Sequence, residues 1–436
     1  MNTFNIAIIG AGPAGYFAAQ ALQNRENDLQ EFKVDLYVKL PTPWGLVRSG
    51  VAPDHQKIKT VSKVFEKVAS HKNFRLFANV ELGIDVFIKD LKKNYDAVVL
   101  ATGASKGKQL NISGENLKNC FSSADFVYWY NAHPDFADLD VDLDTDRAIV
   151  IGAGNVAIDV ARILIKDVKE LENTDIAIHA LEKLKKSGIK EIVICGRRGP
   201  EHAQFTAPEL RELPKIMGVN IDFDQTQIQD AIARTKFNGL YDEKEVRNNL
   251  ETMYEISKIK QEKLDKVLKF RFLLNPVEVI GESKVSKIKF NLNIVEKDNI
   301  KKTEKEKSLD CGLIISAIGY ESFPIDSLMP IQGKFENSGG KIEENLYVIG
   351  WAKRGSNGVI GNLKSDASDV IDLLISNLKL PKKFPNPEKC IKESTVVINQ
   401  KAWEKINKKE IEIGVQSNKP RIKLTSRSEL IGLSRL

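Results

Sequence analysis

Two glycine-rich segments are the parts of this sequence best suited to binding a phosphate-bearing ligand. The first, Gly10-Ala11-Gly12-Pro13-Ala14-Gly15, follows the apolar run Phe4–Ile9. In a G-x-G-x-x-G turn between a strand and a helix, the first glycine permits a tight turn and the second lets the backbone approach a pyrophosphate. The third lets the helix, here Tyr16–Gln23, pack closely on the strand, and the helix N-terminus faces the phosphates. This segment therefore predicts a dinucleotide site.

The second segment, Gly152-Ala153-Gly154-Asn155-Val156-Ala157, follows Val150-Ile151 and precedes a helix predicted over Ile158–Ile165. The next apolar run, Glu191–Cys195, ends in Gly196-Arg197-Arg198. An acid there would bind the 2′-hydroxyl of NAD, whereas two arginines suit the 2′-phosphate of NADP. The alternative is that Arg197 and Arg198 are ordinary surface charges. Two such loops, one of them NADP-like, indicate a flavoprotein in which NADPH meets FAD, with FAD at the first loop.

The first loop lacks one expected partner. An acidic residue usually ends the second strand and binds a ribose hydroxyl. Here that strand is Lys33–Val38, it ends in Val38, and Asp35 lies nearer its start. Backbone groups or water are the expected replacements.

Short apolar runs predict the strands that carry these loops. They are bounded by glycine or polar residues, with helical patterns between them, as in a parallel sheet covered on both faces. The runs are Phe4–Ile9, Ala97–Ala101, Ala148–Ile151, Glu191–Cys195, Gly312–Ile318 and Leu346–Ile349. The predicted class is α/β, with two Rossmann-like, three-layer (ββα/βαβ), glutathione-reductase-like dinucleotide-binding domains. The NADP domain, 107–319, is inserted into an FAD domain formed by 1–106 and 320–378.

Three other regions have weaker patterns. Tyr241–Lys269 has helical spacing and predicts one or two solvated amphipathic helices, and Lys284–Lys307 predicts two strands joined by a lysine-rich hairpin. Beyond Lys379 the pattern becomes less regular. The extension 379–436 is expected to pack on the FAD domain; the alternatives are a source of positive charge for docking and a peripheral appendage.

Composition excludes several classes of protein. Of 436 residues, 42% are hydrophobic, which argues against intrinsic disorder, and the net charge is +6, which allows an acidic partner without demanding nucleic acid. The four cysteines are far apart, which excludes a disulfide scaffold, a cysteine zinc site, a protein-borne iron–sulfur cluster and a redox-active dithiol. No apolar run approaches the roughly 20 residues of a membrane-spanning helix, and no targeting segment is visible, so the expected location is cytoplasmic.

Three longer motifs carry a family resemblance. They are Leu40–His55, Gly196–Pro200 followed by Glu209–Leu213, and Gly350–Gly355 continuing to Gly358–Gly361. From about residue 4 to 376 the sequence resembles the adrenodoxin reductase family, most closely its bacterial ferredoxin–NADP⁺ reductases. The resemblance implies noncovalent FAD, NADP(H), and hydride transfer between NADPH and flavin N5. It also implies one-electron transfer to a ferredoxin or adrenodoxin-like iron–sulfur protein, which we expect to be acidic and transiently bound to a monomer or weak dimer.

The resemblance also implies roles for individual residues. FAD contacts are expected from the first loop and from Leu46, Val80, Trp351, Gly358, Val359 and Ile360. NADP contacts are expected from Gly152, Ala153, Gly154, Asn155, Arg197, Arg198, Glu209 and Gly358, the last lying between the cofactors. Two departures are Val38, in place of the family's ribose-binding glutamate, and Asn362-Leu363, in place of a Thr-Asn pair.

Three residues are expected near the nicotinamide–flavin junction, again from the resemblance. His55 would tune proton supply and orient a water, while Asp159 and Glu212 would fix the nicotinamide and modulate NADP⁺ release. The alternatives are that Asp159 is an ordinary first-turn acid of a helix and that Glu212 belongs to an exposed charged turn. Arg211 is a candidate for a basic docking surface.

Other functions remain open at this point. The glutamate synthase small subunit shares this architecture but carries an N-terminal cysteine-rich region, for which a glycine loop at residue 10 leaves no room. Thioredoxin and glutathione reductases require paired cysteines. A flavin-bound regulatory protein is the non-enzyme alternative, distinguished by whether NADPH reduces its flavin.

Overall fold

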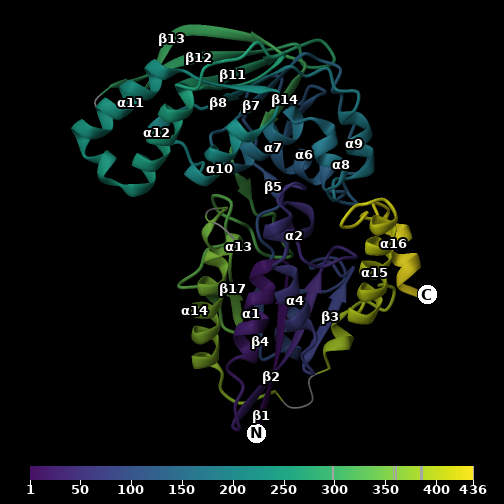
Figure 1. Cartoon of the computed structure of the whole chain (residues 1–436). Coiled ribbons are helices and arrows are strands. Elements are labelled where there is room, and N and C mark those ends of the chain that lie inside the picture. Colours follow the sequence, from purple (N-terminus) through teal and green to yellow (C-terminus); the bar gives the residue numbers. More distant parts are fainter. Residues whose placement is uncertain (297–298, 357, 359–360, 383–385, 436) are drawn as a thin grey trace. The chain divides into compact units, whose positions relative to one another are not determined.

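The chain forms two compact units (Figure 1), and each is described by itself. The computed structural model describes residues 1–296, 299–356, 358, 361–382 and 386–435. Unit 1 comprises 1–106, 131–135 and 320–436, and unit 2 comprises 107–130 and 136–319. The chain leaves unit 1 at β5 (Lys106–Gly107), passes through it again at 131–135, and finally re-enters it at β15 (Tyr320–Glu321). The cofactor bound by each unit, and the predicted borders between functional domains, stay predictions.

Unit 1 is built on a six-stranded sheet in the order β16-β17-β4-β1-β2-β3. All of its strands run parallel except β16. The central β1 buries Phe4, Ile6 and Ile8 in one core and Ala7 and Ile9 in the other. Burial on both faces explains why these strands are continuously apolar instead of alternating. The strands are β1 (Asn2–Ile9), β2 (Gln30–Val38), β3 (Phe74–Ala78), β4 (Ala97–Leu100), β16 (Lys341–Glu343) and β17 (Leu346–Val348).

Helices cover both faces of this sheet. On one face α1 (Pro13–Gln23), α4 (Ser62–Ala69), α14 (Asn362–Asn377) and α15 (Gln400–Gln416) contribute to a single core, and on the other α5 (Ile88–Asn94) packs. The shorter helices of unit 1 are α2 (Leu46–Ser49), α3 (Gln56–Lys59), α13 (Trp351–Arg354), the 3₁₀ turn Pro387–Cys390 and α16 (Arg427–Arg435).

Unit 2 contains a second six-stranded sheet, all parallel, in the order β6-β14-β7-β8-β10-β9. Its strands are β6 (Cys120–Ser122), β7 (Arg147–Ile151), β8 (Glu191–Cys195), β9 (Val219–Phe223), β10 (Lys266–Arg271) and β14 (Leu313–Ser316). An antiparallel sheet of β11 (Leu274–Ile280), β12 (Lys287–Glu296) and β13 (Asn299–Asp310) completes it (Figure 1). The six predicted strands and the predicted lysine-rich hairpin strands are confirmed.

The helices of unit 2 are α6 (Ser123–Tyr130), α7 (Asn155–Ile165), α8 (Val168–Glu172), α9 (Ile178–Leu184), α10 (Ala207–Glu212), α11 (Gln225–Asn238) and α12 (Lys244–Ser257).

Two sequence-based expectations were wrong. The helical pattern predicted over Tyr241–Lys269 ends at Ser257, and the chain then enters β10, which pairs with β8 and β9. Buried Leu268 and Phe270 alternate with partly exposed neighbours there, and pairing with distant strands overrides the helical spacing. The segment beyond Lys379 was expected to be irregular, yet α15 is a 17-residue helix whose N-cap, Asn399, accepts a hydrogen bond from the N–H of Ala402.

Candidate functional site

The first glycine loop joins β1 to α1, and two of its glycines are required by packing within the protein. A methyl group on Gly10, whose φ is +119°, would come within 2.2 Å of the carbonyl oxygen of Ala101. A methyl group on Gly15 would lie 2.0 Å from the carbonyl oxygen of Gly10. These contacts are the tight turn and the close helix–strand approach predicted from the motif.

Gly12 has no such explanation within the protein. A methyl group there would have a single neighbour within 4 Å, the Cα of Gly45 at 4.0 Å. Gly12 is the N-cap of α1, and no side chain caps the N–H groups of that helix's first turn. Open space and unsatisfied donors suit a phosphate-bearing ligand that approaches the backbone closely.

The predicted FAD residues of unit 1 follow the carboxyl ends of neighbouring strands. Leu46 is half-buried at the start of α2, directly after Gly45, which lies against the first loop. Val80 is buried two residues beyond β3, and its N–H donates to the carbonyl of Val38 at 3.0 Å. Parallel strands end at one edge of a sheet, so these residues gather where dinucleotides bind in such folds.

Trp351 begins α13 shortly after β17, and an acid that the sequence analysis missed holds it in place. Asp366 accepts the N–H of Gly350 at 2.7 Å and the ammonium of Lys353 at 2.8 Å. The indole Nε1 of Trp351 and the hydroxyl of Thr102 are buried without a hydrogen-bond partner in the described part of the chain. Two orphaned polar groups near the ends of β17 and β4 suit the edge of a bound polar ring system.

Three further residues were predicted to contact FAD beyond Trp351. Gly358 has a φ of +84°, and a methyl group there would lie 3.2 Å from the amide nitrogen of Asn362. Val359 and Ile360 lie outside the described residues.

The structure shows why Asp35 does not replace the missing ribose acid. Its carboxylate accepts two hydrogen bonds from Arg75, at 2.7 Å each, and one from the hydroxyl of Tyr95 at 2.5 Å. Asp35 is buried, and its oxygens are occupied by protein donors. Val38 ends β2 without a polar side chain, and the replacement of the ribose contact by backbone or water stays a prediction.

The second glycine loop repeats the arrangement in unit 2. A methyl group on Gly152, whose φ is +132°, would come within 2.1 Å of the carbonyl oxygen of Ala317, whereas one on Gly154 would meet only Gln204 at 3.9 Å. Ala153 accepts the N–H of Gln204 at 2.6 Å, and the side chain of Asn155 accepts the N–H of Thr206 at 2.9 Å. Hydrogen bonds from Gln204 and Thr206 thus hold the loop from one side, while the space beside Gly154 stays open.

Arg197 and Arg198 lie exposed just beyond β8, the strand next to β7. Their backbone is held, because Asn293 donates to the carbonyl of Arg197 at 2.8 Å and Leu273 to that of Arg198 at 3.2 Å. Neither guanidinium forms a hydrogen bond or ion pair within the residues that the structure describes. Two uncommitted guanidinium groups at this strand end suit a 2′-phosphate.

A buried arginine organises two of the predicted acids in unit 2. Arg162 on α7 donates to Asp159 at 2.7 Å and lies 3.8 Å from Glu209 on α10, with its own side chain only 2% exposed. Glu212, at the end of α10, is exposed and pairs with Lys215 at 2.7 Å, and Arg211 contacts the hydroxyl of Thr252 at 3.3 Å. The structure therefore brings Asp159 and Glu209 together. Arg162 was missed, although its position three residues after Asp159 is a helical ion-pair spacing.

His55 precedes α3 in unit 1 and is half-buried, and its N–H donates to the carbonyl of Ala52 at 3.0 Å. The predicted grouping of His55 with Asp159 and Glu212 involves both units and stays a prediction.

The cysteines are all free thiols in protected surroundings. Burial raises the pKa of Cys120 and of Cys311 to about 12 and that of Cys390 to about 11, and it also raises the pKa of Cys195. All four are neutral at physiological pH and therefore poor nucleophiles.

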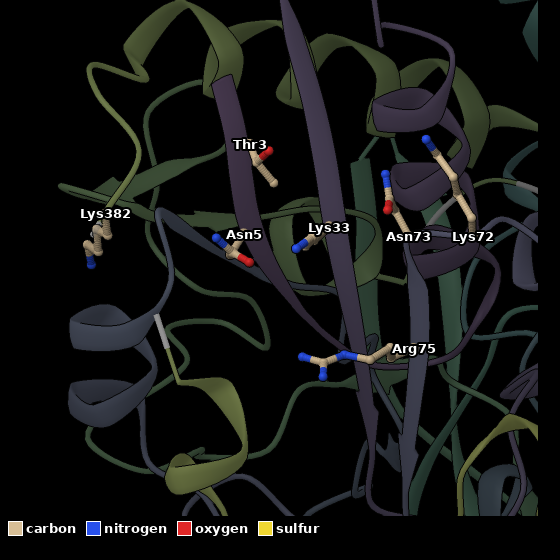
Figure 2. A pocket seen from close by; sticks show the side chains of 7 residues that line it. All are labelled: Thr3, Asn5, Lys33, Lys72, Asn73, Arg75 and Lys382. Atoms are coloured by element: carbon tan, nitrogen blue, oxygen red, sulfur yellow. The ribbon is translucent and has the colours of Figure 1, made fainter. Parts of the chain in front are cut away.

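A cavity of about 540 Å³ in unit 1 is distinct from the glycine loop. Figure 2 shows Thr3 and Asn5 on β1, which place the cavity near the amino end of the strand whose carboxyl end carries Gly10. Its arginine, Arg75, is paired with Asp35, and Lys72 lies 3.8 Å from Glu31. Two of its four cationic residues therefore have an acidic partner within the protein. The lining residues are Thr3, Asn5, Lys33, Lys72, Asn73, Arg75 and Lys382.

Comparisons with known proteins show which proteins the chain resembles. A family model described as pyridine nucleotide-disulphide oxidoreductase matches residues 4–194. The NADPH-ferredoxin reductase FprA of Mycobacterium tuberculosis is 40% identical over 99% of this chain and 99% of its own length. The mitochondrial NADPH:adrenodoxin oxidoreductase of Salvelinus fontinalis is 35% identical over 99% of this chain and 91% of its own length. The solved structure of M. tuberculosis FprA in complex with NADPH has a TM-score of 0.95 at 40% identity, with all of both chains covered. No helix among the described residues has the length and apolar character that crossing a membrane requires.

Proposed function

Because the chain belongs to the adrenodoxin-reductase-like family of ferredoxin–NADP⁺ reductases, we propose that it transfers electrons between NADPH and a ferredoxin-type iron–sulfur protein through FAD. It is an oxidoreductase and a flavoprotein with NADP(H) as its second cofactor. The sequence, the fold and the comparisons support the same reaction class.

One observation carries the proposal. Each unit has a strand–loop–helix turn with one glycine, Gly12 or Gly154, whose missing side chain leaves open space that the protein does not fill. Only the second loop is followed by two uncommitted arginines, Arg197 and Arg198. Two dinucleotide sites of which one prefers a 2′-phosphate are what a flavin enzyme that uses NADPH needs.

FAD would be held in unit 1 by the loop from Gly10 to Gly15, with Leu46, Val80 and Trp351 at the same sheet edge. FAD bound there would supply the hydride-accepting and one-electron-donating chemistry that the reaction needs. The protein's part is to bind and orient. The first turn of α1 offers N–H groups to the pyrophosphate, and Asp366 fixes Gly350 and so the start of α13.

NADP(H) would be held in unit 2, with its pyrophosphate at Gly152–Asn155 and its 2′-phosphate at Arg197 and Arg198. Arg162 pairs with Asp159 on the helix that follows the loop and lies 3.8 Å from Glu209 on α10. We assign Asp159 to orienting the nicotinamide end and His55 to holding a proton or water there. Glu212, exposed and paired with Lys215, would act by modulating NADP⁺ release.

The partner would be an acidic iron–sulfur protein that binds transiently, because the chain carries a net charge of +6 and electrostatic attraction speeds encounter. Arg211 is a candidate for this docking surface. The expected oligomeric state is a monomer or a weak dimer.

The purified full-length protein tests the proposal directly. It should show the absorbance of bound FAD, which NADPH bleaches under anaerobic conditions much faster than NADH does. A flavin that NADPH does not reduce would favour the non-enzyme alternative and refute the proposal.

A further inference from the structure

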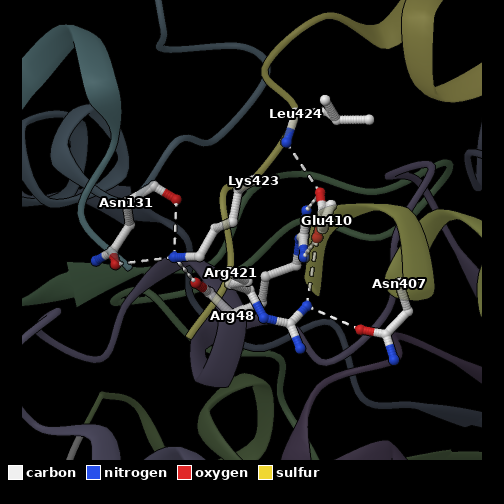
Figure 3. A network of polar contacts seen from close by, with 7 residues as sticks. All are labelled: Arg48, Asn131, Asn407, Glu410, Arg421, Lys423 and Leu424. Atoms are coloured by element: carbon white, nitrogen blue, oxygen red, sulfur yellow. Dashed lines mark hydrogen bonds and ion pairs between the residues drawn. The ribbon is translucent and has the colours of Figure 1, made fainter. Parts of the chain in front are cut away.

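Helix α15, in the C-terminal extension, carries a fully buried carboxylate (Figure 3). Glu410 accepts two hydrogen bonds from Arg48, at 2.7 Å and 2.5 Å, and a third from Arg421 at 3.3 Å. The backbone N–H of Leu424 donates to it at 2.9 Å. Burial alone would raise the pKa of Glu410, but Arg48 and then Arg421 outweigh that effect and hold the pKa below its usual value. The residue is therefore an ionised carboxylate shared between two arginines.

Each of the two arginines also lies over the ring of a tryptophan. The guanidinium of Arg48 lies 5.5 Å from the ring centroid of Trp403 on α15, and that of Arg421 lies 5.3 Å from the ring of Trp44. The two indoles meet edge to face at 5.1 Å. Each arginine is thus held both by the carboxylate and by an aromatic face.

A buried lysine, Lys423, binds the backbone of α2 at Arg48. The ammonium of Lys423 donates to the carbonyl of Arg48 at 2.9 Å and to the carbonyl and side-chain oxygens of Asn131 at 3.2 Å and 3.3 Å. Arg48, in α2, is therefore fixed at both its side chain and its carbonyl by residues of the extension.

The two residues that precede α2, Trp44 and Gly45, lie against the first glycine loop. Trp44 has a φ of +82°, which is costly for a residue with a bulky side chain. Its N–H donates to the carbonyl of Ala11 at 2.7 Å. Gly45 follows with a φ of +51°, and a methyl group on it would lie 2.8 Å from the Cα of Gly12. The conformation of Trp44 and Gly45 thus bears directly on the backbone of Ala11 and Gly12.

We propose that Glu410 is a positioning residue for FAD. By holding Arg48 and Arg421 it keeps Trp44 in its strained conformation, so that Trp44 and Gly45 brace the Ala11–Gly12 backbone in the form that receives the pyrophosphate. Helix α15 is then part of the flavin site, although Glu410 lies 362 residues from Arg48 in the sequence. The inference rests on the proposed binding of FAD at this loop.

The test is Glu410→Gln in the full-length protein, which keeps the shape of the side chain and removes its charge. The dissociation constant for FAD is measured by titrating the apoprotein, and the visible circular dichroism of the bound flavin reports its surroundings. If the braced loop falls to about one tenth of the population, the dissociation constant rises by roughly tenfold, because apparent affinity scales with the population of the competent state. The flavin circular dichroism should change as well.

Two control variants separate positioning from stability. Glu412→Gln alters the same helix at an exposed ion pair with Lys408 at 3.9 Å and should leave FAD binding unchanged. Leu91→Ala opens the core on the opposite sheet face; it should lower the melting temperature of the apoprotein and leave the FAD dissociation constant unchanged.

The outcomes are distinct. If Glu410→Gln lowers the melting temperature as Leu91→Ala does but leaves both FAD affinity and the flavin circular dichroism unaltered, Glu410 is only structural and the inference is overturned. Should Glu410→Gln not fold, Arg421→Gln removes one cation from Trp44 and should weaken FAD binding by roughly threefold; unchanged affinity there overturns the inference too. If the unaltered protein binds no FAD, the proposed function fails, and this inference with it.

Discussion

Replacing Arg197 and Arg198 together by glutamine should remove most of the preference for NADPH over NADH. Both guanidinium groups are exposed beyond β8 and uncommitted within the described residues. A charge-assisted hydrogen bond contributes about 1.5–3 kcal/mol, and solvent exposure argues for the lower value, so two arginines contribute about 3 kcal/mol. At about 1.36 kcal/mol per factor of ten, the ratio of kcat/KM for NADPH to that for NADH should fall about a hundredfold.

The assay is steady-state reduction of ferricyanide with each nucleotide, because that acceptor needs no protein partner. The loss should fall mainly on KM for NADPH, since the 2′-phosphate takes no part in hydride transfer, and kcat/KM for NADH should hardly change. Raising ionic strength should weaken the preference of the unaltered protein more than that of the variant, because salt screens exposed charges.

The control variant is Arg435→Gln, which removes an exposed cation from α16 in unit 1. It should leave the preference intact. If the double variant retains the preference within about threefold, a difference below 1 kcal/mol, the two arginines are ordinary surface charges and the 2′-phosphate assignment is wrong.

Three further predictions follow from the described geometry. Gly12→Ala should fold, since its methyl group would meet only Gly45 at 4.0 Å, but should weaken FAD binding; Gly154→Ala should instead raise KM for NADPH, and equal loss of both cofactors in either variant would contradict the separate assignments. The thiols, with pKa raised to about 12 at Cys120 and Cys311, should resist iodoacetamide at pH 8 until the protein unfolds, as mass spectrometry of intact protein would show; rapid labelling with loss of activity would count against direct flavin-to-partner transfer. Burial lowers the pKa of His133 to about 4, and its Nδ1 accepts the N–H of Asp135 at 3.2 Å. The unfolded state therefore takes up a proton first as pH falls from about 6.5 to 4, and stability should drop by about 3 kcal/mol over that window; chemical denaturation of His133→Gln should show a flatter pH dependence, and equal slopes would refute this origin.

Local sequence signals predicted the elements that carry the site. An apolar run followed by spaced glycines specifies a strand, a turn and a helix within about 20 residues, and both glycine loops were located in this way. The other predicted strands were located as short apolar runs bounded by glycine or polar residues. The paired arginines after β8 were recognisable for the same reason. Their position at the end of one strand is enough to suggest a 2′-phosphate partner.

Contacts between distant segments could not be predicted. Glu410 and Arg48 are 362 positions apart, and a glutamate on a lysine-rich helix resembles any solvated charge until the fold buries it. Asp366 was missed because its partner, Gly350, precedes a different helix. Arg162 has one partner, Asp159, at a recognisable spacing on its own helix, but its second partner, Glu209, comes from α10. Strand β10 was mistaken for helix because its neighbours β8 and β9 come from earlier in the chain.

Reduction of cytochrome c by NADPH, with and without an added ferredoxin, tests the central claim most directly. The protein alone should reduce cytochrome c slowly. Adding an acidic ferredoxin should raise the rate severalfold with saturation, and the stimulation should weaken as salt is added. A rate that no ferredoxin stimulates, from a protein whose flavin NADPH reduces readily, would contradict the assignment of an iron–sulfur protein as the electron acceptor.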